Sequence, residues 1–524
     1  MKTFIHKSLL IALCSTAVVA CQPTLDLVSV GPGSADFSRY VSIGDGTAGG
    51  YADASLNKDA QLVAFPNLLA KQFALLDGAK GFHSAFIQPL VLPLTKGTHT
   101  YTSFGFENNK AGTKYDLKYL TLCKGTGSDT IYELYPEMVD STITTAEISD
   151  LFPNAFKVEA PPSGGHYNNL AAQGTKMIYV NAKPGWKHAP STSSTCDTYW
   201  LKMSSTGSST TGAGAATMLS DAMAQNPTFI SINVGAVDVL RFGKSGGFGT
   251  AARDPLGTSA TPGGDDDMIT PVNEFHDSLY SMLNILTGRG TTVPAPASGL
   301  LVARPANPAN TLKGAIANII GTESFPYFRY IKYNGLVLDD IKVNELNNIY
   351  SAEVAIGQLS FHAGANAYVI GDMAVTNACK CRQIKEDEYI LIEILDSLQY
   401  CYGTGSKVPL WSRWVLDEGE ISTINSYITD YNNILKQAAS DFNFAYVDSH
   451  ANMQPIIKPG GTQYEGITLT NEFVNGNEFS LDGLNISPFG QAASANIWIG
   501  AINSKYGASI PGIDATKYPG VIFH

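Results

Sequence analysis

Polar residues that could do chemistry stand directly after strand-like runs of the sequence. Asp45 and Thr47 follow residues 40–43, which read Tyr-Val-Ser-Ile, and Asp238 follows the apolar run at residues 227–233. A strand that ends in a turn rich in Gly and Asp delivers the next side chains to the carboxyl edge of a sheet, where open α/β folds bind ligands. Ester hydrolysis at such an edge requires a nucleophile, a base, a carboxylate that orients the base, and donors to the oxyanion.

The first of these turns resembles a known sequence block. It reads Gly44-Asp45-Gly46-Thr47-Ala48-Gly49-Gly50-Tyr51-Ala52-Asp53. This is similar to the first block of the SGNH (GDSL-type) hydrolases, and especially to Gly-Asn-Ser-Leu-Thr-Ala-Gly-Tyr-Ala-Asp in the large lipoprotein branch common in Bacteroidetes-type bacteria. The Ser of that block is the family's nucleophile, and it aligns without a gap with Gly46. The resemblance therefore implies a hydrolase scaffold that has lost its nucleophile.

Two further stretches resemble blocks that build the family's oxyanion hole. Residues 168–174 match the second block, in which Gly174 would supply a backbone N–H. The third block, Gly-x-Asn-Asp, aligns with residues 235–238 and puts Val237 where the family has an Asn side chain that donates to the oxyanion. A valine side chain has no donor, so the resemblance implies that half of this hole is missing.

The last block, Asp-x-x-His, aligns with Asp482 and Asn485. Asn485 stands at the position of the base, and an amide cannot take up a proton near neutral pH. Loss of the nucleophile or the base alone lowers turnover on the order of a millionfold in a serine protease. Only Gly174 and Asp482 still match the family's catalytic residues, so no usable triad is expected.

Other side chains could stand in for the lost groups. Thr47 carries a hydroxyl next to Gly46, although it is β-branched and has no assignable base. His166 and His450 could approach the cleft, but a hydrogen-bonded loop histidine explains each of them as well. Ser487 reads as the N-cap of a helix that starts with Pro488. The residues expected to line a ligand cleft are Asp45, Gly46, Thr47, Gly174, Val237, Asp238, Asp482 and Asn485.

The elements that must position these residues alternate between strand and helix. Helical spacing is expected at residues 65–73, 216–224, 272–287, 418–442 and 488–506, and strands at residues 40–43, 227–233, 313–319, 389–394 and 444–448. Such alternation predicts a parallel sheet covered on both faces by helices. We therefore expect an α/β protein with a three-layer α/β/α, flavodoxin-like arrangement, and the SGNH resemblance implies the same fold.

The motifs are spread along the chain, so one large domain at residues 37–510 with insertions fits better than tandem domains. Insertions are expected at about residues 95–160, 185–215, 243–268 and 320–380, the first of them rich in β-structure, and a C-terminal tail at residues 511–524. The acidic run at residues 265–267 reads as a solvated loop, because no liganding spacing follows it.

The N-terminus reads as an export signal. Residues 1–20 have two lysines followed by a short apolar run, which is too short to span a bilayer. The run ends in Val18-Val19-Ala20-Cys21, which resembles a lipobox and implies cleavage before Cys21 and its lipidation. Residues 22–36 are rich in Pro, Gly and Ser and read as a tether. An ordinary signal peptide with a chance cysteine is the alternative.

Charge and cysteine usage limit the partners. The formal net charge of −12 becomes −14 once Lys2 and Lys7 are removed with the signal, and no basic stretch remains. Nucleic acid is therefore not expected as a partner, and no cofactor is expected. Cys379 and Cys381 could form a zinc site, but no His lies near, so disulfides are favoured: Cys401 with Cys379 or Cys381, and Cys123 with Cys196.

Three functions follow from these observations. The first is a membrane-anchored, SGNH-hydrolase-like lipoprotein that has lost catalysis and acts as a binding or scaffold subunit at the outer membrane or cell surface. Its cleft would bind an acylated glycan or a lipid, or its insertions would contact an outer-membrane protein complex. The second is an active esterase or lipase with a displaced nucleophile such as Thr47. The third is a structural or adhesive surface protein.

Overall fold

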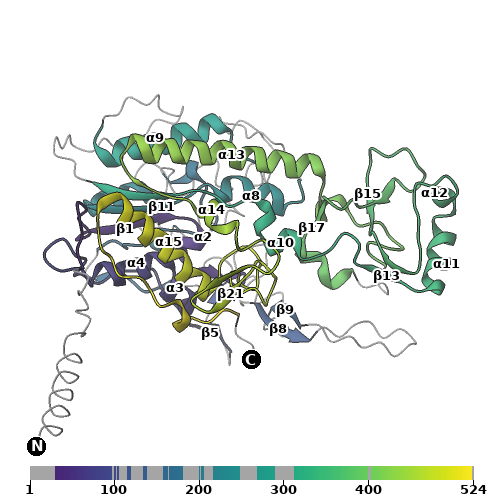
Figure 1. Cartoon of the computed structure of the whole chain (residues 1–524), viewed down its shortest axis with the longest axis horizontal. Coiled ribbons are helices and arrows are strands. Elements are labelled where there is room, and N and C mark those ends of the chain that lie inside the picture. Colours follow the sequence, from purple (N-terminus) through teal and green to yellow (C-terminus); the bar gives the residue numbers. More distant parts are fainter. Residues whose placement is uncertain are drawn as a thin grey trace, which may run out of the picture.

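Four parallel strands form the centre of the protein in a computed structural model (Figure 1). Their order is β1 (Tyr40–Gly44), β11 (Phe229–Asn233), β12 (Lys313–Ala317) and β19 (Ala445–Val447). Val41 lies opposite Ile230, Ile230 opposite Gly314, and Ala315 opposite Ala445. The structure describes residues 30–521 except 97–98, 102, 105–114, 120–133, 139–156, 163–164, 181–199, 201, 206–215, 248–267, 290–311 and 399–402.

A fifth segment extends the sheet beyond β1. Residues 168–172 run parallel to β1, with an isolated bridge between Ser42 and Asn169. The backbone N–H of Leu170 donates to the Ser42 carbonyl at 2.9 Å, and that of Ala172 donates to the Gly44 carbonyl at 3.1 Å. The stretch that resembles the family's second block therefore lies beside the first block at the same sheet edge.

Helices cover both faces of this sheet (Figure 1). One face carries α8 (Ala236–Lys244), α9 (Val272–Thr287) and α13 (Glu418–Asp441), and the other carries α3 (Lys58–Val63), α4 (Phe65–Phe73) and α15 (Pro488–Tyr506). The protein is thus mixed α/β with a parallel central sheet. The helices expected at residues 65–73, 272–287 and 488–506 are confirmed with these bounds, and α7 (Met218–Ala224) also matches its expected segment.

The smaller elements are short helices and short strands, and most of these strands form antiparallel pairs. Short helices are α2 (Gly46–Gly49), α10 (Pro326–Arg329), α11 (Asp340–Ile349), α12 (Ser351–Ala355) and α14 (Ser449–Met453). The paired strands are β2 (Tyr51–Ala52), β3 (Ser55–Asn57) and β7 (Ser103–Phe104); β4 (Val91–Leu92) and β10 (Lys157–Val158); β5 (Leu94–Lys96) and β6 (His99–Tyr101); β8 (Tyr115–Tyr119) and β9 (Leu134–Met138); β13 (Leu336–Leu338) and β14 (Gly364–Asn366); β15 (Val369–Gly371) and β16 (Cys381–Gln383); β17 (Tyr389–Ile390) and β18 (Val415–Leu416); and β20 (Thr462–Tyr464) and β21 (Ile467–Leu469).

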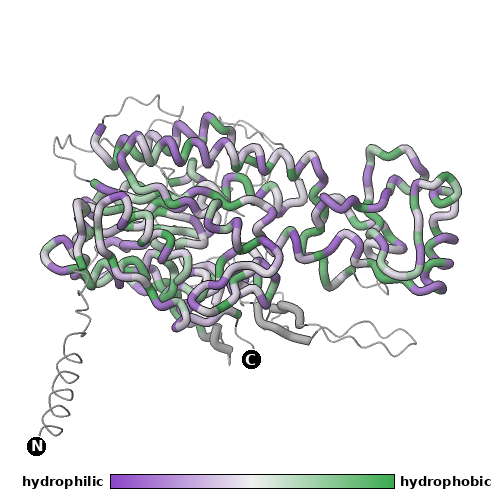
Figure 2. The backbone as a smooth tube through the Cα atoms, viewed as in Figure 1, coloured by the Kyte–Doolittle hydropathy of each residue, from purple (hydrophilic) through white to green (hydrophobic). Residues whose placement is uncertain are grey.

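A module at residues 331–415 projects from the body and has a hydrophobic core of its own (Figure 2). The expected insertion at residues 320–380 is therefore misplaced: residues 325–328 pack in the main core, and the module continues past residue 380. The strand expected at residues 389–394 is also wrong, since β17 ends at Ile390 and a 3-10 helix follows at Ile392–Ser397. The apolar residues of that segment are divided between the two cores: Tyr389 and Leu391 pack in the main core, and Ile390 packs in the module.

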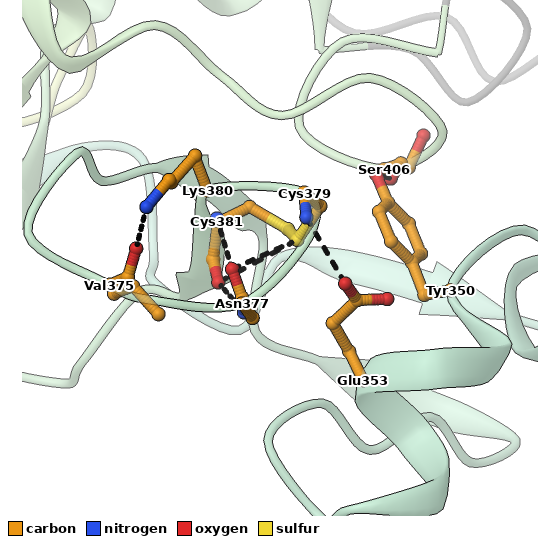
Figure 3. The surroundings of a disulfide bond; sticks show 8 residues. All are labelled: Tyr350, Glu353, Val375, Asn377, Cys379, Lys380, Cys381 and Ser406. Carbon is orange, nitrogen blue, oxygen red and sulfur yellow. Dashed lines mark hydrogen bonds between the residues drawn. A yellow bond between two sulfur atoms is a disulfide. The ribbon is translucent and has the colours of Figure 1, made fainter.

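A disulfide joins Cys379 to Cys381 in this module, with their Cα atoms 5.2 Å apart (Figure 3). The expected pairing of one of these cysteines with Cys401 is therefore wrong. Lys380 between them has a φ of 50°, which turns the chain tightly enough for the two sulfurs to meet. The Asn377 side chain bonds to both the N–H and the carbonyl of Cys381 and holds this turn (Figure 3). Cys123, Cys196 and Cys401 lie outside the described residues.

Both chain ends of the described region pack on the body, which corrects two expectations. Residues 31–36 are not a free tether, since Ala35 is fully buried and the Ser34 N–H donates to the Tyr506 carbonyl at 2.9 Å. Residues 511–521 are not a free tail either, since Ile513 and Ala515 are buried. Cys21 and residues 1–20 lie outside the described residues. Within the described part, none of the helices has the length and apolarity that a bilayer crossing requires.

Candidate functional site

The turn after β1 is built around the Asp45 carboxylate. Asp45 caps the short helix α2 by accepting from the Thr47 N–H at 3.1 Å, and it accepts from the Asn233 amide at 3.2 Å. Asn233 is the last residue of β11, so this contact ties the ends of two adjacent strands together. Burial raises the pKa of Asp45 to about 7, although the hydrogen bonds oppose this shift.

Gln173 occupies the space next to Gly46. A Cβ atom added to Gly46 would lie 1.5 Å from Oε1 of Gln173, so a side chain at position 46 and the present position of Gln173 exclude each other. Gln173 is brought here because residues 168–172 pair with the edge of β1. Gly174 in this segment is a predicted cleft residue and Gln173 is not, since only the strand register shows that the two segments meet.

Thr47, Asn485 and Asp482 form a chain of side-chain hydrogen bonds. The Thr47 hydroxyl donates to Oδ1 of Asn485 at 3.3 Å, and Nδ2 of Asn485 donates to Oδ2 of Asp482 at 3.0 Å. This order of hydroxyl, bridging group and carboxylate matches the order of a catalytic triad. The bridging amide differs from an imidazole because it cannot accept the hydroxyl proton and pass it on.

Asp482 holds this series of hydrogen bonds in place through further contacts with the backbone. Its carboxylate also accepts from the backbone N–H groups of Leu484, Asn485 and Ala54 at 2.9, 2.7 and 3.1 Å. The last of these bonds ties the loop after α2 to the segment before α15. Burial raises the pKa of Asp482, and the bonds to the charged form oppose that rise.

Two glycines at the expected oxyanion hole have positive φ angles. Gly174 has a φ of 81° and Gly235 a φ of 104°, and a side chain at Gly235 would collide with Phe275 and Ile319. Gly235 precedes α8, which puts Val237 in the first turn of that helix. Val237 contributes a methyl surface at the position where the resemblance implies an amide.

These residues surround a cavity of about 350 Å³ at the carboxyl edge of the sheet. This volume lies in the range of small-molecule sites, which is roughly 300–1,000 Å³. Six of the predicted cleft residues line the cavity: Asp45, Gly46, Thr47, Gly174, Val237 and Asn485. Much of the remaining wall is apolar, and it includes Phe65, Leu240, Phe325, Met453, Ile497 and Trp498.

Two predicted cleft residues do not line the cavity. Asp238 is fully buried and accepts from the Met177 N–H at 2.8 Å, because the helix that starts after Gly235 turns it into the protein. Asp482 is 8% exposed and lies behind Asn485, to which it is bonded. Both carboxylates therefore support the cavity wall instead of facing a ligand.

Three charged residues line the cavity although the sequence did not predict them there: Glu478, Arg241 and Lys244. Glu478 is 5% exposed, and burial raises its pKa to about 7. Arg241 and Lys244 stand on the C-terminal half of α8. The predicted cleft residues all lie in sequence motifs, and none of these three residues falls in a motif. No local pattern in the sequence therefore indicates that they line the cavity.

Neither candidate histidine lines the cavity. His166 lies beside Asp221 of α7, with 3.4 Å between Nδ1 and Oδ1, and His450 lies on α14 next to Gln454. Ser487 caps α15 as expected, accepting from the Gly490 N–H at 3.0 Å. Among the described residues no three His, Cys, Asp or Glu side chains gather as metal ligands would.

No protein-family model, no curated protein and no solved structure gives a significant match to this chain.

Proposed function

We propose that the chain has an SGNH-hydrolase-like scaffold that has lost catalysis and now binds an apolar ligand in the cavity at the old active site. The order of the sheet supports the scaffold. When residues 168–172 are counted as the second strand, the chain order across the sheet is 2-1-3-4-5, which is the order of flavodoxin-like folds. The four sequence blocks that resemble the family all reach the same sheet edge.

The contact between Gly46 and Gln173 is the main observation that supports the proposed loss of catalysis. An active hydrolase needs open space above its nucleophile so that the substrate carbonyl can approach it. Here Oε1 of Gln173 lies 1.5 Å from the Cβ position of residue 46, so a nucleophilic side chain there would require the flexible end of Gln173 to move. This contact supports the proposed loss of the nucleophile, and in the proposed scaffold Asn485 would keep only the hydrogen-bonding part of the base's role.

The cavity itself remains, and its wall indicates the ligand. Aromatic and aliphatic side chains from both faces of the sheet line it, including Leu240 of α8 and Trp498 of α15. Burial of a CH₂ group in such a wall contributes about 0.8 kcal/mol to binding. The ligand we propose is an acyl or alkyl chain, either free or attached to a lipid or glycan.

A cavity-filling variant tests the proposed binding site. We expect Val237→Trp, whose larger side chain enters the cavity, to weaken binding of a neutral ten-carbon alcohol at least tenfold in calorimetric titration. Leu75→Trp is the matched control, because Leu75 is 55% exposed and does not line the cavity. Equal affinities for both variants and the original protein would exclude the cavity as the binding site.

We also propose where the protein is located and that it has a protein partner. The lipobox-like segment supports an exported protein that is anchored through Cys21, at the outer membrane or cell surface, where it serves as a binding or scaffold subunit. Surface apolar residues support a protein partner: of nine exposed large apolar side chains in the described residues, seven lie between Val337 and Trp411. We take the concentration of these side chains on one module as support for an interaction surface there.

Purification from detergent-solubilised membranes tests the partner. We expect a tagged full chain to bring down a membrane protein or another lipoprotein in stoichiometric amount. Ile341→Ser with Trp411→Ser should lose that partner, since these two side chains are 80% and 70% exposed. Leu75→Ser on the main body serves as the control and should retain it. A clean monomer from the unaltered chain would contradict a subunit role.

An esterase with a displaced nucleophile is the second candidate. The observation in its favour is the chain from the Thr47 hydroxyl through Asn485 to Asp482. Its weakness is that the amide cannot act as a base. Ester turnover that Thr47→Ala abolishes would establish this candidate.

A further inference from the structure

Glu478 introduces a buried carboxyl group into the wall of an otherwise largely apolar cavity. It is 5% exposed and lines the cavity together with Leu469, Ile486 and Trp498. Its Oε2 atom is shielded from solvent and has no hydrogen-bond partner among the described residues. A buried carboxyl oxygen without a partner costs about 1–3 kcal/mol or more, so proteins rarely keep one without a reason.

The main chain of Glu478 is firmly held, so the residue cannot turn out into water cheaply. Its carbonyl accepts from the Ser487 N–H at 2.8 Å, directly before α15. Gly490 in the first turn of α15 packs against the same carbonyl, and a Cβ there would lie 2.4 Å from it. The neighbouring residue Phe479 forms a bridge with Ile486. Both sides of Glu478 are thus fixed, and its side chain stays at the cavity.

Among the described residues, Glu478 has no positively charged partner. None of the ion pairs between described residues includes it, and burial is the cause of its raised pKa. The other titratable side chains in the cavity lining are Asp45, Arg241, Lys244 and Tyr464. Of these, Tyr464 has a pKa that is raised mainly by burial, and the charges of Glu465 and Glu478 add to that rise.

We infer that Glu478 binds the ammonium group of a single-chain amphiphile whose apolar part lies along the wall formed by residues such as Trp498 and Met453. A primary ammonium supplies both the positive charge and the donors that this carboxylate lacks. The inference rests on the proposed function, because it assumes that the cavity binds an apolar ligand. It adds the chemical class of the ligand: a long-chain primary amine, or a larger molecule that presents one.

Binding of an ammonium group requires Glu478 to be ionised, so its proton is released to solvent when the ion pair forms. With a pKa of about 7, the proton competes with the amine below neutrality. Amine affinity should therefore fall by roughly a hundredfold between pH 8 and pH 5. Asp45 in the same cavity also has a pKa raised to about 7, so the pH profile must be compared with that of a variant at Glu478.

Calorimetric titration with decylamine, 1-decanol and decanoate tests the inference on the full chain. We expect the original protein to bind decylamine at least tenfold more tightly than decanol, and decanoate more weakly than both. Glu478→Gln should lose the preference for the amine, lose most of the pH dependence, and still bind decanol. Glu472→Gln is the matched control, because Glu472 is exposed and lies outside the cavity, and it should behave as the original protein does.

The failure of this inference is distinct from the failure of the proposed function. Equal affinities for amine and alcohol, or an amine preference that survives Glu478→Gln, would overturn the role of Glu478 while cavity binding stands. No binding of any of the three amphiphiles, or binding that Val237→Trp leaves unchanged, would overturn the cavity as a ligand site, and with it the inference.

Discussion

The triple variant Gly46→Ser/Gln173→Ala/Asn485→His is expected to gain hydrolysis of short-chain nitrophenyl esters. The double variant with Gln173 intact should be at least tenfold slower, because Oε1 of Gln173 lies 1.5 Å from the Cβ position of residue 46. Asp482 is already in place to orient an imidazole, since its Oδ2 accepts from the side chain of residue 485 at 3.0 Å. Restoring the nucleophile and the base addresses the two losses that each lower turnover on the order of a millionfold.

A fourth change tests the oxyanion hole separately. Val237→Asn added to the triple variant should raise turnover by about a further hundredfold, the usual effect of one oxyanion donor. Steady-state rates with nitrophenyl acetate give all of these comparisons. Significant turnover by the unaltered chain that Thr47→Ala abolishes would contradict the loss of catalysis. If the double variant matches the triple variant, Gln173 is not an obstacle.

The free energy of unfolding is expected to fall as the pH rises from about 4 to about 7. Asp45 and Glu478 both have a pKa raised to about 7 by burial, whereas in the unfolded chain carboxyls titrate near 4. Between these values the folded state holds protons that the unfolded state has lost, so stability decreases with pH. The loss should total about 4 kcal/mol for Asp45 and about 3 kcal/mol for Glu478, and it should be complete near pH 8.

Glu478→Gln isolates one of these contributions. The variant should be more stable than the original protein by about 3 kcal/mol at pH 8 and nearly equal to it at pH 4, because a neutral amide needs no deprotonation penalty. Urea unfolding at several pH values measures the difference. Glu472→Gln on the surface should leave the profile unchanged. An unaltered pH slope in Glu478→Gln would show that its carboxyl titrates normally in the folded protein.

Elements whose signals are local could be predicted from the sequence. The bounds of α4, α9 and α15 follow from apolar spacing and from Pro66, Pro271 and Pro488 at their starts. Ser487 was identified as a cap because a Ser before a Pro is a local pattern. Six cleft residues also line the cavity, since the carboxyl ends of parallel strands meet at one edge of the sheet.

Features that depend on tertiary contacts could not be predicted. Gln173 and Gly46 are neighbours only because residues 168–172 pair with β1, and sequence spacing carries no record of that register. Glu478 enters the cavity from an irregular segment with no motif. Asp238 was expected to face a ligand because it follows a strand, but the first turn of α8 rotates it into the core. Helix rotation of this kind is set by packing rather than by position in a motif.

Strands β17 and β18 form a stem that contributes side chains to both hydrophobic cores. In β17 and β18, Tyr389 and Leu416 pack in the main core, while their neighbours Ile390 and Val415 pack in the module. The ring of Tyr389 lies 6.4 Å from that of Phe328, which lies 6.2 Å from that of Phe325 in the cavity wall. If the proposed partner and ligand both bind, they would lie at opposite ends of one series of packed aromatic rings.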